Sequence, residues 1–132
     1  LRDLRESRRD LDVRGFDISS YAVEHAEAAV RDAVFVHDAR NRFPLEGRSV
    51  DLVVSINTLH NLYPHELVPA LREVERVGKR AYVVVESYRN ETEKFNLVCW
   101  NLTGECFFTP DEWRWVFEAT GYTGDYEFIF FE

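Results

Sequence analysis

Polar residues follow several short apolar segments of this sequence, and two of them are carboxylates suited to a nucleoside. Asp17 is the last residue but one of the segment 13–18, and Asp38 directly follows the segment 33–37. A carboxylate only accepts hydrogen bonds, so Asp17 suits the two hydroxyl groups of a ribose. Asp38 suits the exocyclic amine of adenine, with the backbone N–H of Ala39 available for a ring nitrogen. A solvated turn or a helix cap is the simpler interpretation of either aspartate alone, but the pair favours a nucleoside site.

The segments that position these residues alternate between strand and helix patterns. Apolar runs predict strands over residues 13–18, 33–37, 51–56, 81–85 and 126–131. Helical spacing and capping residues predict helices over residues 1–9, from Ser19 or Ser20 to Val30, 64–77 and 109–121. Residues 89–108 fit either a hairpin around Thr103-Gly104 or an aromatic cover. The alternation predicts one domain over residues 1–132, an α/β fold with a parallel sheet and helices on both faces. Such sheets bind ligands at the carboxyl ends of their strands.

Three segments, taken in order, resemble successive motifs of class I S-adenosylmethionine-dependent methyltransferases. These are Val13–Ser19, Val36–Ala39 and Asp51–His60, and the resemblance continues to the region around Gly121-Tyr122. It implies a Rossmann-like sheet of seven strands whose last strand is antiparallel, and it implies S-adenosyl-L-methionine as the cofactor. The cofactor-binding residues that it implies are Asp17 and Ile18 for the ribose region, Asp38 and Ala39 for adenine, and Ser55 and Asn57 beside the methionyl part.

The family's glycine-rich cofactor loop is not found in this sequence, whose first glycine is Gly15. In dinucleotide-type sites the acidic residue follows such a loop by about 20 residues, which places the loop just before Leu1. We therefore expect an N-terminally truncated domain that lacks its first strand, which is central in the family's sheet. We also expect these 132 residues alone to bind the cofactor weakly.

Methyl transfer needs alignment of the two reactants and in some cases a base, so no fixed catalytic signature is expected. His60 is the best-placed candidate for a catalytic base, because it stands three residues after Asn57 and imidazole titrates near neutral pH. The alternative for His60 is a packing or hydrogen-bonding role. Tyr63, Glu86 and Tyr88 are candidates for substrate binding, and a satisfied pair at the end of a strand is the alternative for the last two.

Charge and cysteine content restrict the partners. A formal net charge of −8 disfavours a nucleic-acid partner and favours a small-molecule or sugar-like acceptor. No stretch is long and apolar enough for a membrane span, and we expect a cytoplasmic protein. The spacing of Cys99 and Cys106 fits no zinc motif, so we expect two buried thiols and no metal site.

Two other functions remain open at this point. In a nicotinamide-dependent oxidoreductase of Rossmann type, Asp17 would bind a ribose equally well, although that fold does not require Asp38. A non-catalytic interaction module without a cofactor loop is the third hypothesis. The sequence upstream of Leu1 would discriminate among the three, because each enzyme class has its own glycine pattern.

Overall fold

The computed structural model describes all 132 residues, and the chain divides into two compact units. The N-terminal unit is Leu1–Asn41 and the C-terminal unit is Arg42–Glu132. Each unit has its own small parallel sheet, two-stranded in the first and three-stranded in the second. We describe each unit by itself, and the expectation of a single domain stays a prediction.

The N-terminal unit is built around two short strands that run in parallel. Its elements are α1 (Arg2–Ser7), β1 (Gly15–Asp17), α2 (Ser20–Glu24), the 3₁₀ turn η1 (Arg31–Ala33) and β2 (Val34–Val36). Helix α2 begins where predicted, because the Ser19 side chain accepts a hydrogen bond from the backbone N–H of Ala22. It ends at Glu24, well before Val30, so the predicted helix is too long.

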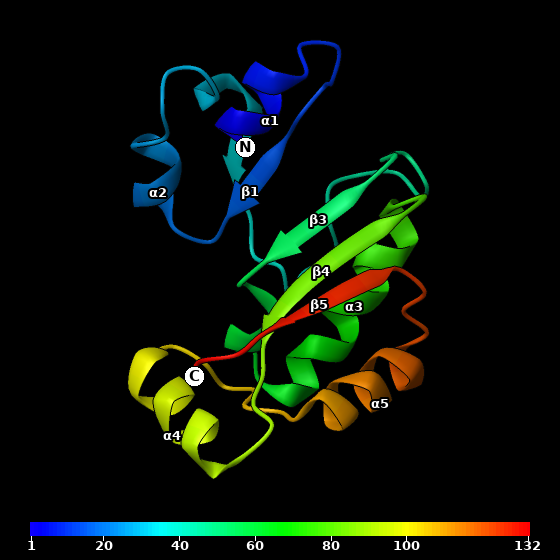
Figure 1. The fold of residues 1–132 in the computed structure, drawn as a ribbon. Coiled ribbons are helices and arrows are strands. Elements are labelled where there is room, and N and C mark those ends of the chain that lie inside the picture. The colour runs from blue at the N-terminus through cyan, green and yellow to red at the C-terminus, as the bar shows by residue number, and fades with distance from the viewer. The chain divides into compact units, whose positions relative to one another are not determined.

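The C-terminal unit holds a parallel sheet in the order β3-β4-β5, which Figure 1 shows as three arrows. Its elements are β3 (Val53–Ile56), the 3₁₀ turn η2 (Leu59–Asn61), α3 (Pro64–Val77), β4 (Ala81–Glu86), α4 (Glu91–Trp100), α5 (Pro110–Thr120) and β5 (Asp125–Ile129). The central strand β4 is buried along almost its whole length, as expected for a strand paired on both sides.

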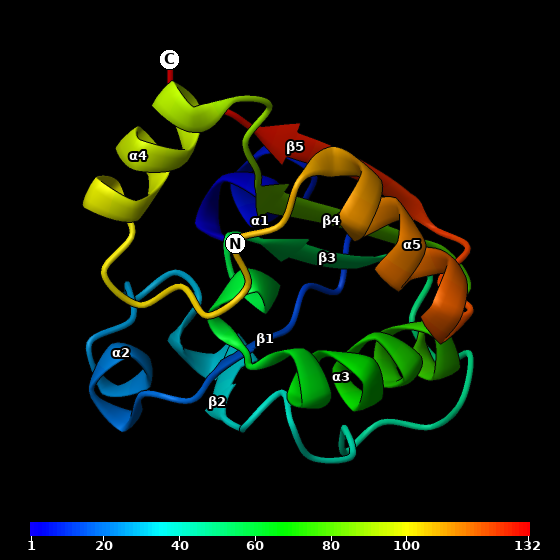
Figure 2. The same ribbon diagram turned by 90° about the horizontal axis from the view of Figure 1, so that it is seen from below.

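Helices α3 and α5 lie side by side along one face of this sheet (Figures 1 and 2). Helix α3 has the predicted bounds and buries Leu67, Leu71 and Val74 at helical spacing. Helix α5 buries Trp113 and Phe117 against the same core. None of the helices combines the length and the apolar character needed to traverse a membrane.

The predicted antiparallel last strand is wrong, because β5 pairs with β4 in parallel, with Tyr82 opposite Asp125 and Glu86 opposite Ile129. The chain leaves β4, passes through α4 and α5, and returns to the starting edge before β5 begins. A crossover of this kind brings the next strand back in the same direction, whereas an antiparallel neighbour is reached by a hairpin. The α/β class with parallel strands is confirmed, and the absence of a central strand stays a prediction.

Residues 91–100 form helix α4, so neither a hairpin nor an irregular aromatic cover describes them. The Asn90 side chain accepts from the backbone N–H of Glu93 and caps the first turn, and the Glu93 side chain is ion-paired with Arg89. The apolar residues of α4 itself are distributed around the helix instead of forming a stripe. For this reason the sequence showed no helical periodicity here. Cys99 on α4 is exposed, contrary to expectation, while Cys106 is buried, and both are free thiols.

The C-terminal end of α5 provides a test of the backbone geometry. Gly121 has φ of 76°, in the left-handed region, and a Cβ there would meet no atom within 4 Å. We predict that Gly121→Ala lowers the free energy of unfolding by about 1 kcal/mol, through backbone strain alone. The measurement is urea unfolding followed by circular dichroism. Gly47→Ala is the control, since its Cβ would make only an ordinary contact, 3.6 Å from the carbonyl oxygen of Arg76. Equal stability of the two variants would contradict the prediction.

Candidate functional site

The two predicted nucleoside ligands lie at one edge of the N-terminal sheet. Strand β1 pairs with β2 so that Asp17 is opposite Val36, and the backbone N–H of His37 donates to the carbonyl oxygen of Asp17 at 2.9 Å. Asp38 follows His37 directly, so both aspartates stand at the carboxyl ends of neighbouring parallel strands. This is the edge at which α/β sheets bind ligands.

Asp17 is exposed and only partly engaged by the protein. Its Oδ1 accepts a hydrogen bond from the backbone N–H of Ser19 at 2.8 Å, which forms the turn that leads into α2. The carboxylate therefore also has the turn role that was the simpler interpretation of this residue. Its other oxygen has no recorded hydrogen bond and can accept from a ligand hydroxyl. The neighbouring side chain of Ile18 is 62% exposed and provides an apolar surface beside it.

Asp38 is held by Arg40, a residue that the sequence analysis did not single out. The Arg40 Nε lies 2.9 Å from both carboxylate oxygens and Nη2 lies 2.6 Å from Oδ2, while the Arg40 backbone N–H donates to Oδ1. These hydrogen bonds from Arg40 lower the pKa of Asp38, which burial opposes. Asp38 is therefore anionic at neutral pH, and a ligand amine would share this carboxylate with Arg40. Ala39 between them is half-buried.

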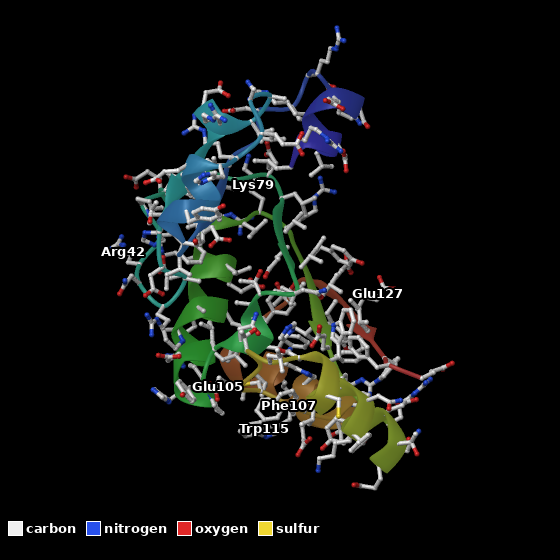
Figure 3. The ribbon with its side chains drawn as sticks, turned by 90° about the vertical axis from the view of Figure 1, so that its left-hand side faces the viewer. Arg42, Lys79, Glu105, Phe107, Trp115 and Glu127 are labelled. Carbon is white, nitrogen blue, oxygen red and sulfur yellow. The ribbon has the colours of Figure 1, made fainter.

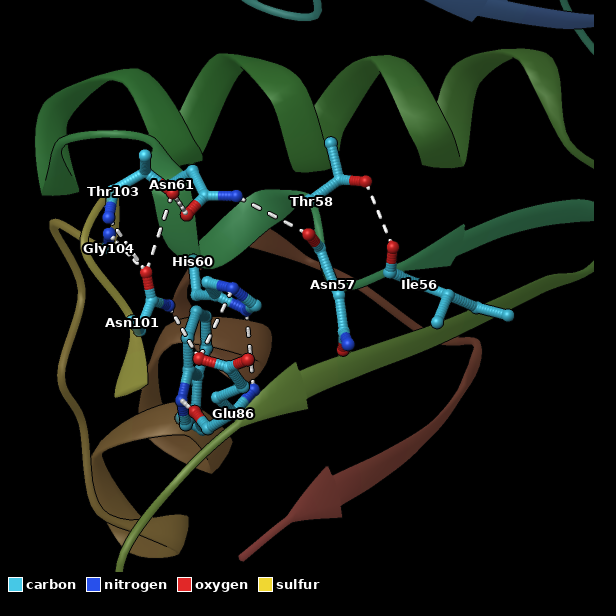
Figure 4. A network of polar contacts seen from close by, with 10 residues as sticks. Ile56, Asn57, Thr58, His60, Asn61, Glu86, Asn101, Thr103 and Gly104 are labelled. Carbon is cyan, nitrogen blue, oxygen red and sulfur yellow. Dashed lines mark hydrogen bonds and ion pairs between the residues drawn. The ribbon is translucent and has the colours of Figure 1, made fainter. Parts of the chain in front are cut away.

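The C-terminal unit has a second polar cluster, at the carboxyl ends of β3 and β4 (Figure 4). Its centre is the pair of His60 on η2 and Glu86, the last residue of β4, with 3.5 Å between Nε2 and Oε2. Both side chains are almost fully buried. The Trp113 indole N–H donates to the backbone carbonyl oxygen of Glu86 at 3.1 Å, so the end of β4 is fixed from the helix side as well.

One hydrogen bond to the ring determines the tautomer of His60. The backbone N–H of Glu86 points to His60 Nδ1 at 3.3 Å. A backbone N–H only donates, so Nδ1 carries the lone pair and the neutral ring has its proton on Nε2, toward the Glu86 carboxylate. Burial lowers the pKa of His60, and the nearby charge of Glu86 opposes that shift. With both nitrogens engaged, this geometry favours a hydrogen-bonding role over that of a base acting on a substrate.

Asn101 connects this pair to the segment between α4 and α5. Its Nδ2 donates to Glu86 Oε2 at 2.5 Å, and its Oδ1 accepts from the backbone N–H groups of Thr103 and Gly104. The carbonyl oxygen of His60 accepts from two further residues of this segment, Glu105 and Cys106. Figure 3 shows Glu105 and Phe107 at the opposite end of the unit from Lys79, which precedes β4. Residues 101–106 are thus tied to η2 and to the end of β4.

The other predicted residues of this unit lie near the same edge. Ser55 on β3 is opposite Val83, and Asn57 follows β3 with φ of 52° while its N–H donates to the carbonyl oxygen of Val84. Two predicted substrate residues, Tyr63 and Tyr88, make no recorded hydrogen bond to Glu86. Tyr63 is half-exposed, and its pKa is raised by the negative charge of Glu105 and by the hydrogen bond that the Tyr63 hydroxyl donates to that carboxylate. Tyr88 is half-buried under the Lys94 ammonium group, 5.2 Å from the ring centre.

A family model described as a methyltransferase domain matches residues 1–85. The chain belongs to the methyltransferase domain family. This confirms the family that the sequence motifs indicated. No curated protein and no solved structure matches the chain. The matched part of this methyltransferase domain contains Asp17, Asp38, Asn57 and His60, and it ends one residue before Glu86. The assignment of individual residues to cofactor or substrate stays a prediction.

Two residues of these clusters, Arg40 and Asn101, were missed at the sequence level. Arg40 had a local signal, because a cation two residues after a turn aspartate lies within reach of its carboxylate. Asn101 had none, since its partner Glu86 is fifteen residues away and the turn that joins them follows an unrecognised helix.

The lowered pKa of His60 predicts a pH dependence of stability in this methyltransferase domain. Because the unfolded chain binds a proton at His60 more readily than the folded chain, stability rises with pH through the interval below about pH 6.5. We predict that His60→Gln has a smaller change in free energy of unfolding between about pH 5.5 and 7 than the wild type. The measurement is urea unfolding across that range. His65→Gln, at an exposed position, is the control and should follow the wild type. An unchanged pH slope in His60→Gln would contradict the prediction.

Proposed function

We propose that this chain is an S-adenosylmethionine-dependent methyltransferase that acts on a small-molecule or sugar-like acceptor. The observation that carries the proposal is the register of β1 and β2, which sets Asp17 and Asp38 at the same edge of a parallel sheet. The family match supports methyl transfer as the class of reaction. When bound, the cofactor supplies a methyl group that its sulfonium already activates.

The residues of the N-terminal unit fit the nucleoside part of this cofactor. Asp17 is exposed and has one carboxylate oxygen without a hydrogen bond in the structure, which suits it to the ribose hydroxyls. Asp38 is kept ionised by Arg40 and suits the adenine amine, with the Ala39 N–H available for a ring nitrogen. Ile18 offers an exposed apolar side chain next to Asp17. For the methionyl part, the family resemblance assigns Ser55 and Asn57.

The acidic composition supports a small acceptor. A net charge of −8 opposes binding of a polyanionic backbone, which depends on contacts from lysine and arginine. A nicotinamide-dependent oxidoreductase would use Asp17 in the same way, but the family match favours methyl transfer. Absence of any nucleoside binding would instead favour a non-catalytic interaction module.

Binding of the methyl donor tests the two aspartates. We predict that Asp17→Ala and Asp38→Ala each weaken binding of S-adenosylmethionine about 10-fold or more, because each removes a charged hydrogen-bond acceptor. The measurement is a titration of the ¹⁵N-labelled chain with S-adenosylmethionine, followed by NMR chemical shifts. This method also resolves the weak affinity expected for these 132 residues.

The methyl donor carries a sulfonium cation, which any carboxylate attracts. A charge-matched control therefore distinguishes loss of a direct hydrogen bond from loss of this long-range attraction. Asp12→Ala removes the same charge from an exposed position in the N-terminal unit and should bind like the wild type. If all three variants lose affinity equally, or if neither Asp17→Ala nor Asp38→Ala loses any, the proposed nucleoside site is wrong.

A further inference from the structure

Glu86 has a buried carboxylate of which only one oxygen is engaged. Its side chain is 7% exposed, and both of its recorded side-chain partners, Asn101 Nδ2 and His60 Nε2, face Oε2. The other oxygen, Oε1, makes no hydrogen bond in the structure. It is also not fully sealed from solvent. Glu86 therefore has one carboxylate oxygen, Oε1, that receives no hydrogen bond at the carboxyl end of β4 and is not fully sealed from solvent.

The protein does not neutralise this charge. No lysine or arginine is paired with Glu86, and the nearby cation Arg89 is bound to Glu93 and Glu132 instead. The one titratable partner, His60, is held neutral by burial, with its Nε2 proton toward the carboxylate. A carboxylate in a desolvated place is costly unless donors or a cation satisfy it. One hydrogen bond from Asn101 and the 3.5 Å approach of His60 Nε2 leave part of its accepting capacity unused.

The position of this carboxylate is fixed from three sides. Trp113 holds the backbone carbonyl of Glu86, His60 accepts its backbone N–H, and Asn101 donates to its Oε2. A group held in this way by packed and hydrogen-bonded neighbours is suited to orient a ligand. Glu86 stands at the ligand-binding edge of the C-terminal sheet, beside the end of β3. There the N–H of Asn57 donates a hydrogen bond to the carbonyl oxygen of Val84.

We propose that Glu86 Oε1 binds the methyl acceptor and that the acceptor presents a hydroxyl or ammonium group to it. This inference rests on the proposed function and specifies its substrate class. An acceptor with a carboxylate or phosphate at this point is excluded by like charge, because no cation compensates Glu86. His60 and Asn101 are positioning residues, since they act through the carboxylate.

Three probes with the same ring and different head groups test the proposal. The full 132-residue chain, labelled with ¹⁵N, is titrated with benzylamine, benzyl alcohol and benzoate in separate NMR experiments. The reporter is the indole N–H resonance of Trp113, which is hydrogen-bonded to Glu86. We expect benzylamine and benzyl alcohol to shift this resonance and benzoate to leave it in place. Binding of benzoate as tightly as benzylamine would overturn the proposal.

Glu86→Gln then tests the residue itself, with an expected loss of about 10-fold in affinity for benzylamine. Glu118→Gln removes the same charge from an exposed position on α5 and should bind benzylamine like the wild type. If Glu86→Gln does not fold, Glu86→Asp keeps the charge and should retain the preference for benzylamine over benzoate. Wild-type affinity in Glu86→Gln, or loss of the preference in Glu86→Asp, would overturn the proposal.

The probes need no methyl donor, so this test is separate from that of the nucleoside site. Asp12→Ala, the exposed control used above, should bind benzylamine like the wild type. A chain that binds S-adenosylmethionine but shows no amine preference would refute the role of Glu86 alone.

Discussion

Parallel pairing of strands is the constraint on which the rest of the structure depends. In the C-terminal unit, β4 hydrogen-bonds to β3 on one side and to β5 on the other, all in the same direction. The carboxyl ends of parallel strands lie at the same edge of a sheet. The residues that follow these strands are therefore placed at that edge by the strand pairing alone. Glu86 and Asn57 stand at one edge of the C-terminal sheet for this reason, as Asp17 and Asp38 do at one edge of the N-terminal sheet.

The carboxylates at the two edges differ in what neutralises them. Asp38 is bound by the guanidinium of Arg40, a strong charge-assisted contact that keeps it ionised and fixes its orientation. Glu86 is held only by neutral donors in a buried place. The first arrangement suits a neutral amine that shares the carboxylate. The second leaves a negative charge that a ligand hydroxyl or cation would compensate. We therefore assign the two residues to different ligands.

Sequence patterns predicted the elements that depend on local signals. Helix α3 follows from a stripe of Leu67, Leu71 and Val74, and α5 follows from its Thr109 cap and the glycine that ends it. The antiparallel last strand was expected from the family resemblance and not from a local pattern, and it is wrong because the chain returns through α4 and α5 before β5 begins. Local patterns cannot report which distant side chain satisfies a buried group, so the bond from Asn101 to Glu86 was also missed.

The same limit explains the change in the interpretation of His60. Its position after the apolar segment 51–56 suggested a base, and sequence position is all that a strand-end argument can use. The structure shows that the adjacent N–H of Glu86 and the carboxylate of the same residue occupy both ring nitrogens. A histidine whose two nitrogens are engaged within the fold orients its neighbours, and here the neighbour is the carboxylate that we assign to the acceptor.

The central claim is that the carboxylates of the N-terminal unit bind the nucleoside part of S-adenosylmethionine. Saturation-transfer difference NMR tests it most directly, because it reports which protons of a weakly bound ligand lie against the protein. The account predicts the strongest transfer to the ribose and adenine protons of S-adenosylmethionine. Transfer to the methionyl protons alone, or no transfer to any proton, would contradict it.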